Sequence, residues 1–365
     1  MRTITSTLEA AQFASSVQPY IHLWLTHYDE LGTGNYTSYN MSSDTNRLLY
    51  LEHVEEPYGG SATIVLTNHE HYYPDDFVGY HTQIGYGAVT SEGNEYEETA
   101  RLWVSRHTNV SSEGKNWIVL ELTDTWTYLA KTMLRMGEAP YYTEVLNTVT
   151  VYDFINIIFI SVGLVLNELT SDNDDGIVNT MTPYISLNEP PYFDSAKDAI
   201  YRVLCATKCF LRMKPDLKAE IVYPTISGNA YDLEYFSDAS PQFKEADIQF
   251  NPMAANHIYV FANSGGDPET GTVGNWADMV VGEAYDSDEQ ERYHYLIDSS
   301  GNKLIKPIYE HLIEPFITTQ GDADNIANAR LFKHQANKTG GRIVIQHDSR
   351  LELFDYIGIH DNRGK

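Results

Sequence analysis

The chain has 365 residues, of which 42% are hydrophobic and 12% aromatic, so its composition is that of a folded protein and excludes general disorder. It carries 51 Asp and Glu against 24 Lys and Arg, a formal net charge of −27. This excess of carboxylates argues against nucleic-acid readout, which gains affinity from cationic contacts with phosphate. The length favours two or three domains.

Residues 1–135 are predicted to form a β domain. Ser6 and Glu9 have the spacing of a capping box, which predicts a short first helix. Residues 20–28 alternate apolar and polar side chains, the pattern of a half-buried strand. Gly-rich turns separate the later strands, and regular short strands of this kind favour a barrel or sandwich. These strands are predicted at 48–54, 62–67, 80–85, 102–107 and 116–123.

Residues 136–228 are predicted to form a small α/β module. A nearly continuous apolar helix is expected over 151–169, and the acidic segment 172–176 ends it. A second helix is expected over 195–210, with Asp194 as its N-cap. Strands at 209–213 and 219–223 follow. The apolar stripe of the second helix consists of Ala196, Ala199, Ile200, Val203 and Leu204.

Residues 229–365 return to strands, predicted at 257–262, 279–284 and 291–297. A helix interrupted by Pro307 and Pro315 is expected over 304–318. An Ala-rich helix at 322–336 then leads to a strand at 340–346 and to the motif Leu351-Glu-Leu-x-Asp355. The whole pattern predicts a mainly β fold with an α+β insert, in which two β-barrel-like tube domains flank the small α/β module.

The closing segment 322–361 resembles the final module of tailed-phage baseplate and tail-tip hub proteins: Ala-rich helix, strand, turn, Leu-Glu-Leu-x-Asp, strand. A second resemblance lies in residues 55–66, 84–90, 102–104 and 111–114, whose order is similar to the tube-forming N-terminal domain of the same family. The chain is therefore expected to resemble a tail hub protein over most of its length.

This resemblance implies a structural protein of the virion, located at the tail tip and assembled in the host cytoplasm. It implies a homotrimeric ring that closes the tail tube, with a distal tail ring protein, a tape-measure protein and a tip or spike protein as neighbours. DNA would pass through without specific binding. An inner wall with more carboxylates than Lys and Arg would suit such passage, because it repels phosphate.

Three acidic or histidine clusters could carry chemistry, and each has a structural interpretation that we prefer. His69 and His71, with Asp75 and Asp76, have two imidazoles on one strand face and could hold a metal, or they form a polar loop rim. The aspartates 172, 174 and 175 lack the EF-hand spacing and are interpreted as an acidic turn. A third cluster precedes a predicted strand and is interpreted as a charged β-edge rather than a glycosidase pair; it consists of Asp286, Asp288, Glu289 and Glu291.

No P-loop, dinucleotide fingerprint, His-Glu-x-x-His or Gly-x-Ser-x-Gly motif is present, so we expect no enzyme, no cofactor and no metal. Cys205 and Cys209 are expected on one helix face as buried free thiols. The most apolar run, 154–166, is too short for a membrane span, so no membrane insertion is expected. The alternatives are a receptor- or glycan-binding tail accessory protein, which would use exposed Trp and Tyr, and a cell-wall hydrolase. Trp24, Trp103 and Trp117 lie in predicted strands, which favours core positions instead.

Overall fold

The computed structural model describes residues 1–28, 36–68, 73, 76–134, 149–182, 195–215, 217–250, 253–262, 279–292, 298–302, 307–314, 317 and 319–363. Strands account for 42% of these residues and helices for 20%. The predicted mainly β fold with added helices is therefore confirmed. No helix within the described ranges has both the length and the apolar character that a membrane crossing needs.

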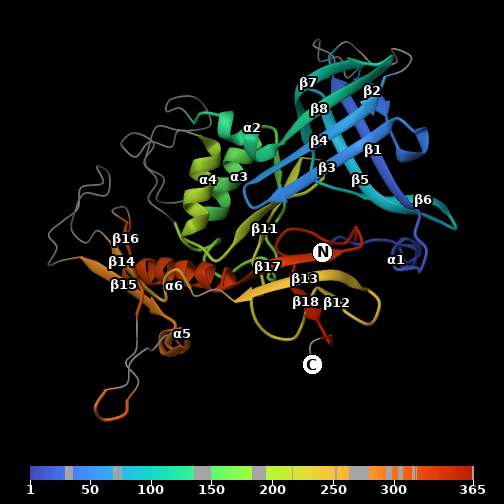
Figure 1. Cartoon of the computed structure of the whole chain (residues 1–365). Coiled ribbons are helices and arrows are strands. Elements are labelled where there is room, and N and C mark those ends of the chain that lie inside the picture. The colour runs from blue at the N-terminus through green and yellow to red at the C-terminus, as the bar shows by residue number, and fades with distance from the viewer. Residues whose placement is uncertain are drawn as a thin grey trace.

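The N-terminal region is one antiparallel sheet, blue to cyan in Figure 1. Its order is β2-β1-β5-β7-β8-β4-β3, and β6 pairs with β5. All the strands predicted here are present, and β2 and β6 were missed. The bounds are β1 Pro19–Tyr28, β2 Tyr36–Asn40, β3 Leu48–Glu56, β4 Gly59–Thr67, β5 His81–Thr90, β6 Gly93–Glu98, β7 Leu102–Ser112 and β8 Lys115–Asp124.

This sheet curls around its own apolar core. Leu23, Ile64, Ile84 and Leu120 come from four different strands and are fully buried in one cluster. Because alternate residues of a strand share a face, these side chains mark the inner face of the sheet. A single sheet that buries one face around a common core must bend around it. A short 3₁₀ helix, η1 (Ser43–Thr45), follows β2.

Helix α1 (Ser6–Gln12) begins at the first residue of the predicted capping box, so its N-cap lies one residue earlier than expected. Its N-cap is Thr5, whose side chain accepts the backbone N–H of Leu8. The N-cap of α4 (Ala196–Cys205) is Ser195 rather than Asp194, because the Ser195 hydroxyl accepts the N–H of Asp198. Hydroxyl side chains thus begin both helices, as N-cap preferences allow.

The middle region packs helices against a small sheet of order β10-β11-β9. The predicted helix 151–169 is too long: α3 ends at Ser161, and Gly163 has a positive φ of 76°, which lets the chain turn into β9. The predicted apolar stripe of α4 is buried, as expected. The bounds are α2 Thr125–Lys131, α3 Val151–Ser161, β9 Val165–Leu166, β10 Phe210–Met213 and β11 Lys218–Val222.

A three-stranded sheet of order β15-β14-β16 lies beside the long helix α6 (Gln320–Ala336), orange and red in Figure 1. The strands are β14 His257–Ala262, β15 Val280–Tyr285 and β16 Tyr309–Glu314. Two predictions are wrong here. Part of the expected helix 304–318 is the strand β16, and the strand expected at 291–297 begins as the end of helix α5 (Ser287–Arg292). Residues 293–297 lie outside the described part of the chain.

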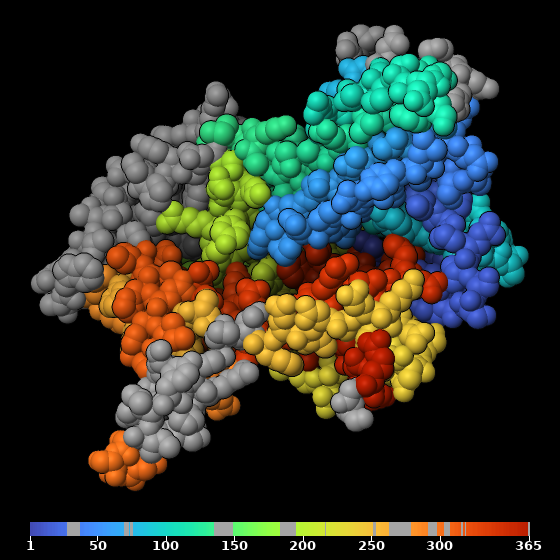
Figure 2. Space-filling view, in the orientation of Figure 1, coloured from blue at the N-terminus to red at the C-terminus, as the bar shows by residue number. Residues whose placement is uncertain are grey.

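Two further strand pairs complete the C-terminal region: β12 (Leu233–Phe236) with β18 (Ile357–His360), and β13 (Phe243–Phe250) with β17 (Thr339–Ile345). In Figure 2 these strands, yellow and red, lie directly under the blue N-terminal sheet. The largest apolar cluster includes Trp126, Ile200, Ile258 and Ile326. One core therefore continues across the expected boundary at residue 228, and the three-part division stays a prediction.

Candidate functional site

A group of charged side chains joins the three predicted regions of the chain, and we call it the ion network. Glu55 belongs to β3, Arg212 to β10, and Glu352 and Asp355 to the segment before β18. Ion pairs hold these distant segments together. The ion network consists of the Met1 ammonium, Arg2, Glu55, Arg212, Lys214, Glu220, Glu352 and Asp355.

Glu352 is the centre of the ion network. Its carboxylate lies 2.5 Å from Lys214 Nζ, 3.4 Å from Arg212 Nη1 and 3.5 Å from Arg2 Nε, and its side chain is only 2% exposed. Asp355 Oδ1 lies 3.2 Å from the same Arg212 nitrogen. A buried carboxylate is tolerated where cations and hydrogen bonds replace water, and here the cations come from two segments, the N-terminus and residues 212–214.

This geometry gives the motif Leu351-Glu-Leu-x-Asp355 a physical role. Its two acids, Glu352 and Asp355, both form ion pairs with Arg212. The Arg212 guanidinium also donates a hydrogen bond to the carbonyl of Leu353 at 3.0 Å. Phe354, one of the two residues between them, has a φ of 72°, which is unusual for a residue with a Cβ, and its ring stacks on Phe210 with 4.6 Å between centroids. The strained backbone position is thus held by packing against the β10 strand.

Burial and charge act in opposite directions within the ion network. Burial alone would raise the pKa of Glu352, but Arg212 and the hydrogen bond from Lys214 outweigh it and hold that pKa below its usual value. For Glu55, burial prevails over Arg2 and raises the pKa. The ion network therefore keeps a firmly ionised carboxylate at its centre and a more easily protonated one at its edge.

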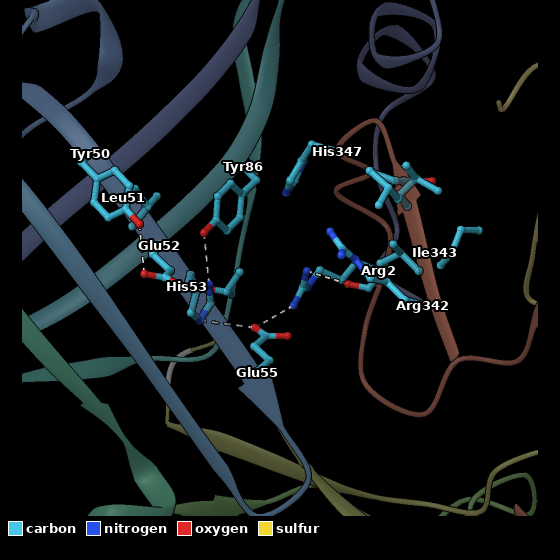
Figure 3. A pocket seen from close by; sticks show the side chains of 15 residues that line it. Arg2, Tyr50, Leu51, Glu52, His53, Glu55, Tyr86, Arg342, Ile343 and His347 are labelled. Atoms are coloured by element: carbon cyan, nitrogen blue, oxygen red, sulfur yellow. Dashed lines mark hydrogen bonds and ion pairs between the residues drawn. The ribbon is translucent and has the colours of Figure 1, made fainter. Parts of the chain in front are cut away.

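Beside the ion network lies a cleft of about 720 Å³ between β3 and β17 (Figure 3). Residues 50–53 and Glu55 line one wall, and residues 342–345 line the other. Arg2 reaches in at one end, where its Nη1 donates to the carbonyl of Leu351 at 2.8 Å. Two regions of the chain that are almost 300 residues apart in sequence thus form a single recess.

Three rings are arranged in a row within this cleft: His53, Tyr86 and His347. The His53 and Tyr86 rings are nearly parallel at 6.0 Å, and Tyr86 and His347 lie 4.4 Å apart. His53 Nδ1 is 3.2 Å from the Tyr86 hydroxyl. Burial, helped by the charge of Arg2, lowers the pKa of His53 to about 4. The ring is therefore neutral at physiological pH and can donate or accept one hydrogen bond at each nitrogen.

A second candidate surface is the outer side of the β15-β14-β16 sheet, which we call the aromatic face. The inner side, with Ile258, Val260 and Ala284, is buried. Gly282 allows α6 to lie directly on this inner side, because a Cβ there would come within 2.2 Å of the Ala323 carbonyl. The outer side points to solvent. The aromatic face consists of His257, Tyr259, Phe261, Val281, Glu283, Tyr285, Tyr309, His311 and Ile313.

Strand register orders the aromatic face into cross-strand rows. His257 pairs with Tyr285 on one side and with Tyr309 on the other, and Tyr259 pairs with Glu283 and with His311 in the next row. Tyr285 is 58% exposed and Tyr309 is 53% exposed. Glu283 accepts from His257 Nε2 at 2.7 Å and from the Tyr259 hydroxyl at 3.1 Å.

The rings of the aromatic face stand against one another rather than lying flat. His257 and Tyr259 are 4.6 Å apart at an angle of 23°, and Tyr309 and His311 are 6.1 Å apart at 26°. A ring face covered by its neighbour is not free to stack on a sugar. The arrangement therefore suits contact with another protein surface, where Tyr and other aromatic residues are enriched.

The acidic cluster at 172–175 binds backbone groups. Asp174 Oδ1 accepts the N–H of Gly176 at 2.9 Å, and Asp175 Oδ2 accepts the N–H of Lys208 at 2.7 Å. These bonds fit the interpretation as an acidic turn. Of the predicted histidine cluster, His69, His71 and Asp75 lie outside the described residues. Among those that are described, no group of His, Cys, Asp and Glu has a metal-binding arrangement.

The cluster at 286–291 is not a charged β-edge, because the segment is helix α5. Asp286 accepts the N–H of Glu289 at 3.0 Å and the Gln335 amide at 2.8 Å, so it begins the helix and ties it to α6. Glu289 is buried in an ion pair with Lys338. Asp288 is exposed. The side chain of Glu291 lies outside the description.

The predicted places of the tryptophans and cysteines need correction. Trp24 is exposed, and Trp103 and Trp117 are only partly buried, because each occupies the outer face of its strand. Cys209 is buried beyond the end of α4, so it does not share a helix face with Cys205, which is partly buried; both are free thiols. The aromatic face itself was missed, although aromatic residues at every second position of 257–261 are its signal.

No protein-family model matches the chain, and no curated protein matches its sequence. Solved structures do match the fold. A tail protein from Neisseria meningitidis MC58 has a TM-score of 0.59 and 9% identity, over 94% of this chain and 87% of that one. The 43 kDa tail protein of prophage MuSo2 from Shewanella oneidensis has a TM-score of 0.55 and 12% identity, over 94% and 89%. The chain thus shares the fold of two tail proteins along nearly its whole length.

Proposed function

We propose that the chain is a structural hub protein of a viral tail tip or baseplate. The observation that carries this proposal is the match in fold to two tail proteins, which covers most of both partners in each comparison. In this proposal the protein has no catalytic role and acts in the virion, after assembly in the host cytoplasm.

The proposed hub is a homotrimeric ring that closes the tail tube. The aromatic face supports a contact between proteins, because it gathers the exposed side chains of Val281, Tyr285, Tyr309 and Ile313 on one sheet face, and contiguous exposed apolar side chains mark interaction sites. Its one acidic residue, Glu283, is already paired with His257, so the patch adds little repulsion between two acidic chains. The remaining proposed neighbours are a distal tail ring protein, a tape-measure protein and a tip or spike protein.

The test is the mass of the assembled species in solution and in purified particles. A trimeric ring gives a mass that is a multiple of three chains. Tyr309→Glu should reduce assembly at least about tenfold, because it places a charge in the centre of a desolvated contact, and it should leave the melting temperature of the subunit unchanged. Tyr128→Glu, at a similarly exposed tyrosine of α2, is the matched control. A stable monomer in particles would contradict the proposal.

The charge of −27 supports a second part of the proposal, that DNA passes through the ring without specific binding. Carboxylates on the inner wall would repel phosphate and keep a moving duplex from adhering. A structure of the assembled ring tests this directly by the charges that face its axis. A neutral or basic inner wall would remove the conduit argument and leave the hub assignment to the mass measurement.

A further inference from the structure

Both walls of the cleft are strands at the end of their sheets. β3 pairs with β4 on one side, and β17 pairs with β13 on one side. In the part of the chain that the structure describes, neither has a strand on its other side. An unpaired edge presents a row of backbone N–H and C=O groups, and such an edge is a template for another strand.

The lining of the cleft indicates that these edges face inward. Residues 50–53 line it from β3 and residues 342–345 from β17, four in succession on each wall. Because successive side chains of a strand point to opposite faces, a wall made of consecutive residues is the edge of the strand and not one of its faces. Figure 3 shows the two strands on opposite sides of the recess.

The size of the cleft fits a short stretch of extended chain. A strand in a sheet takes up roughly 4.8 Å between neighbours and roughly 10 Å across the sheet. The volume of about 720 Å³ then corresponds to roughly 15 Å of strand, or about four residues at ~3.4 Å each. This length agrees with the four consecutive residues on each wall.

The side chains of the walls define the chemistry of the occupant. Ile343 and Ile345 pack on a small apolar cluster that contains Tyr235 and Phe243, so one face of an added strand would extend that cluster. Arg342 belongs to the other face, is exposed, and forms no ion pair within the described residues. The neutral ring of His53 and the Tyr86 hydroxyl are hydrogen-bonded to each other and add a polar surface without charge.

We propose that the cleft binds an extended peptide segment of a partner protein by strand addition to the edges of β3 and β17. The segment has apolar side chains at alternate positions and a carboxylate beside Arg342. Backbone hydrogen bonds supply the affinity, and the alternating pockets supply the selectivity. This inference goes beyond the hub proposal and does not depend on the symmetry of the ring.

A synthetic peptide tests it. The probe is a fluorescent peptide of seven residues, the length of β17, that alternates Val with Thr and carries one central Glu in place of a Thr. Fluorescence anisotropy should show saturable binding, and hydrogen exchange should show protection of backbone amides in 50–53 and 342–345 on both walls. The same peptide with alternate amides N-methylated should bind at least about tenfold more weakly, because it loses several backbone hydrogen bonds.

Two variants complete the test. Arg342→Glu should weaken binding of the peptide about two- to tenfold, as the loss of an exposed ion pair with added repulsion predicts. Arg106→Glu, at an exposed arginine of β7 that pairs with Glu121, should leave binding unchanged. Absence of binding, equal binding of the N-methylated peptide, or protection confined to one wall would overturn the proposal. If protection of these amides grows with protein concentration in the absence of peptide, a second copy of the chain is the occupant, and the proposal of a partner peptide is overturned.

Discussion

The ion network and the aromatic face both gather side chains from segments far apart in the sequence, but they differ in how much of those side chains the protein itself covers. In the ion network, Glu352 is nearly inaccessible and has four cations within 3.5 Å. On the aromatic face, Tyr285 and Tyr309 remain more than half exposed although their rings touch neighbours. The first joins parts of one chain, and the second is left available for another surface. Substitutions at matched positions in the two regions test this difference.

The largest expected difference concerns a charge placed in the core or on the face. Val203 on α4 is 4% exposed, whereas Ile313 on the aromatic face is 56% exposed. Val203→Asp should lower the free energy of unfolding by at least about 4 kcal/mol, because it buries an unpaired charge. Ile313→Asp should change it by less than about 1 kcal/mol. Chemical denaturation measures both, and an unchanged stability for Val203→Asp would mean that the α4 stripe is not buried.

Removal of the central charge of the ion network is expected to cost somewhat less. Glu352→Gln removes the buried negative charge that pairs with Arg212 and Lys214. The uncompensated cations should lower the free energy of unfolding by about 3 kcal/mol. Asp355 still pairs with Arg212 and limits the loss. The control is Glu121→Gln, which breaks an exposed pair with Arg106 and should cost less than about 1 kcal/mol. Equal effects at the two sites would show that the ion network does not hold the regions together.

The pH dependence of stability follows from the same carboxylate. Arg212 and Lys214 hold the pKa of Glu352 below its usual value of 4.5, so the folded chain binds fewer protons there than the unfolded chain does. This contribution is complete above pH 4.5 and is lost as the pH falls through the lowered pKa. Glu352→Gln should therefore lose stability less steeply with acid than the parent chain. Denaturation at several pH values below 5 measures the slopes, and parallel slopes would contradict the assignment.

The sequence predicted the strands of the N-terminal region better than those near the C-terminus, for a physical reason. The curled sheet has one buried face, so its strands show period-two alternation and are separated by Gly-rich turns. Residues 304–318 have an apolar pattern with prolines, which does not by itself separate a helix from a strand. Pairing with β14 makes residues 309–314 a strand, and that partner is about 50 residues away in sequence.

The candidate site was harder to predict than the fold. The motif at 351–355 was recognised as a pattern, but nothing in it indicates that Glu352 meets Arg212 of β10 and Lys214 just after it, about 140 residues earlier. The cleft likewise depends on the meeting of β3 and β17, which local propensity does not encode. The aromatic face could have been found, because Tyr and His at alternate positions of 257–261 are aromatic where a half-exposed strand is usually polar.

The smallest expected effect is at Glu283, the acid of the aromatic face. Its hydrogen bonds to His257 and Tyr259 lie at a surface where water competes, so Glu283→Gln should change the unfolding free energy of the subunit by less than about 0.5 kcal/mol. If a second protein covers the face, the same pair becomes desolvated, and the substitution should then weaken assembly measured by analytical ultracentrifugation. The neutral amide can still accept from His257, so the loss should remain smaller than that of Tyr309→Glu. A large loss of subunit stability would mean that the Glu283 hydrogen bonds stabilise the fold of the single chain, as the ion network does. The aromatic face would then not be a surface left available for a second protein.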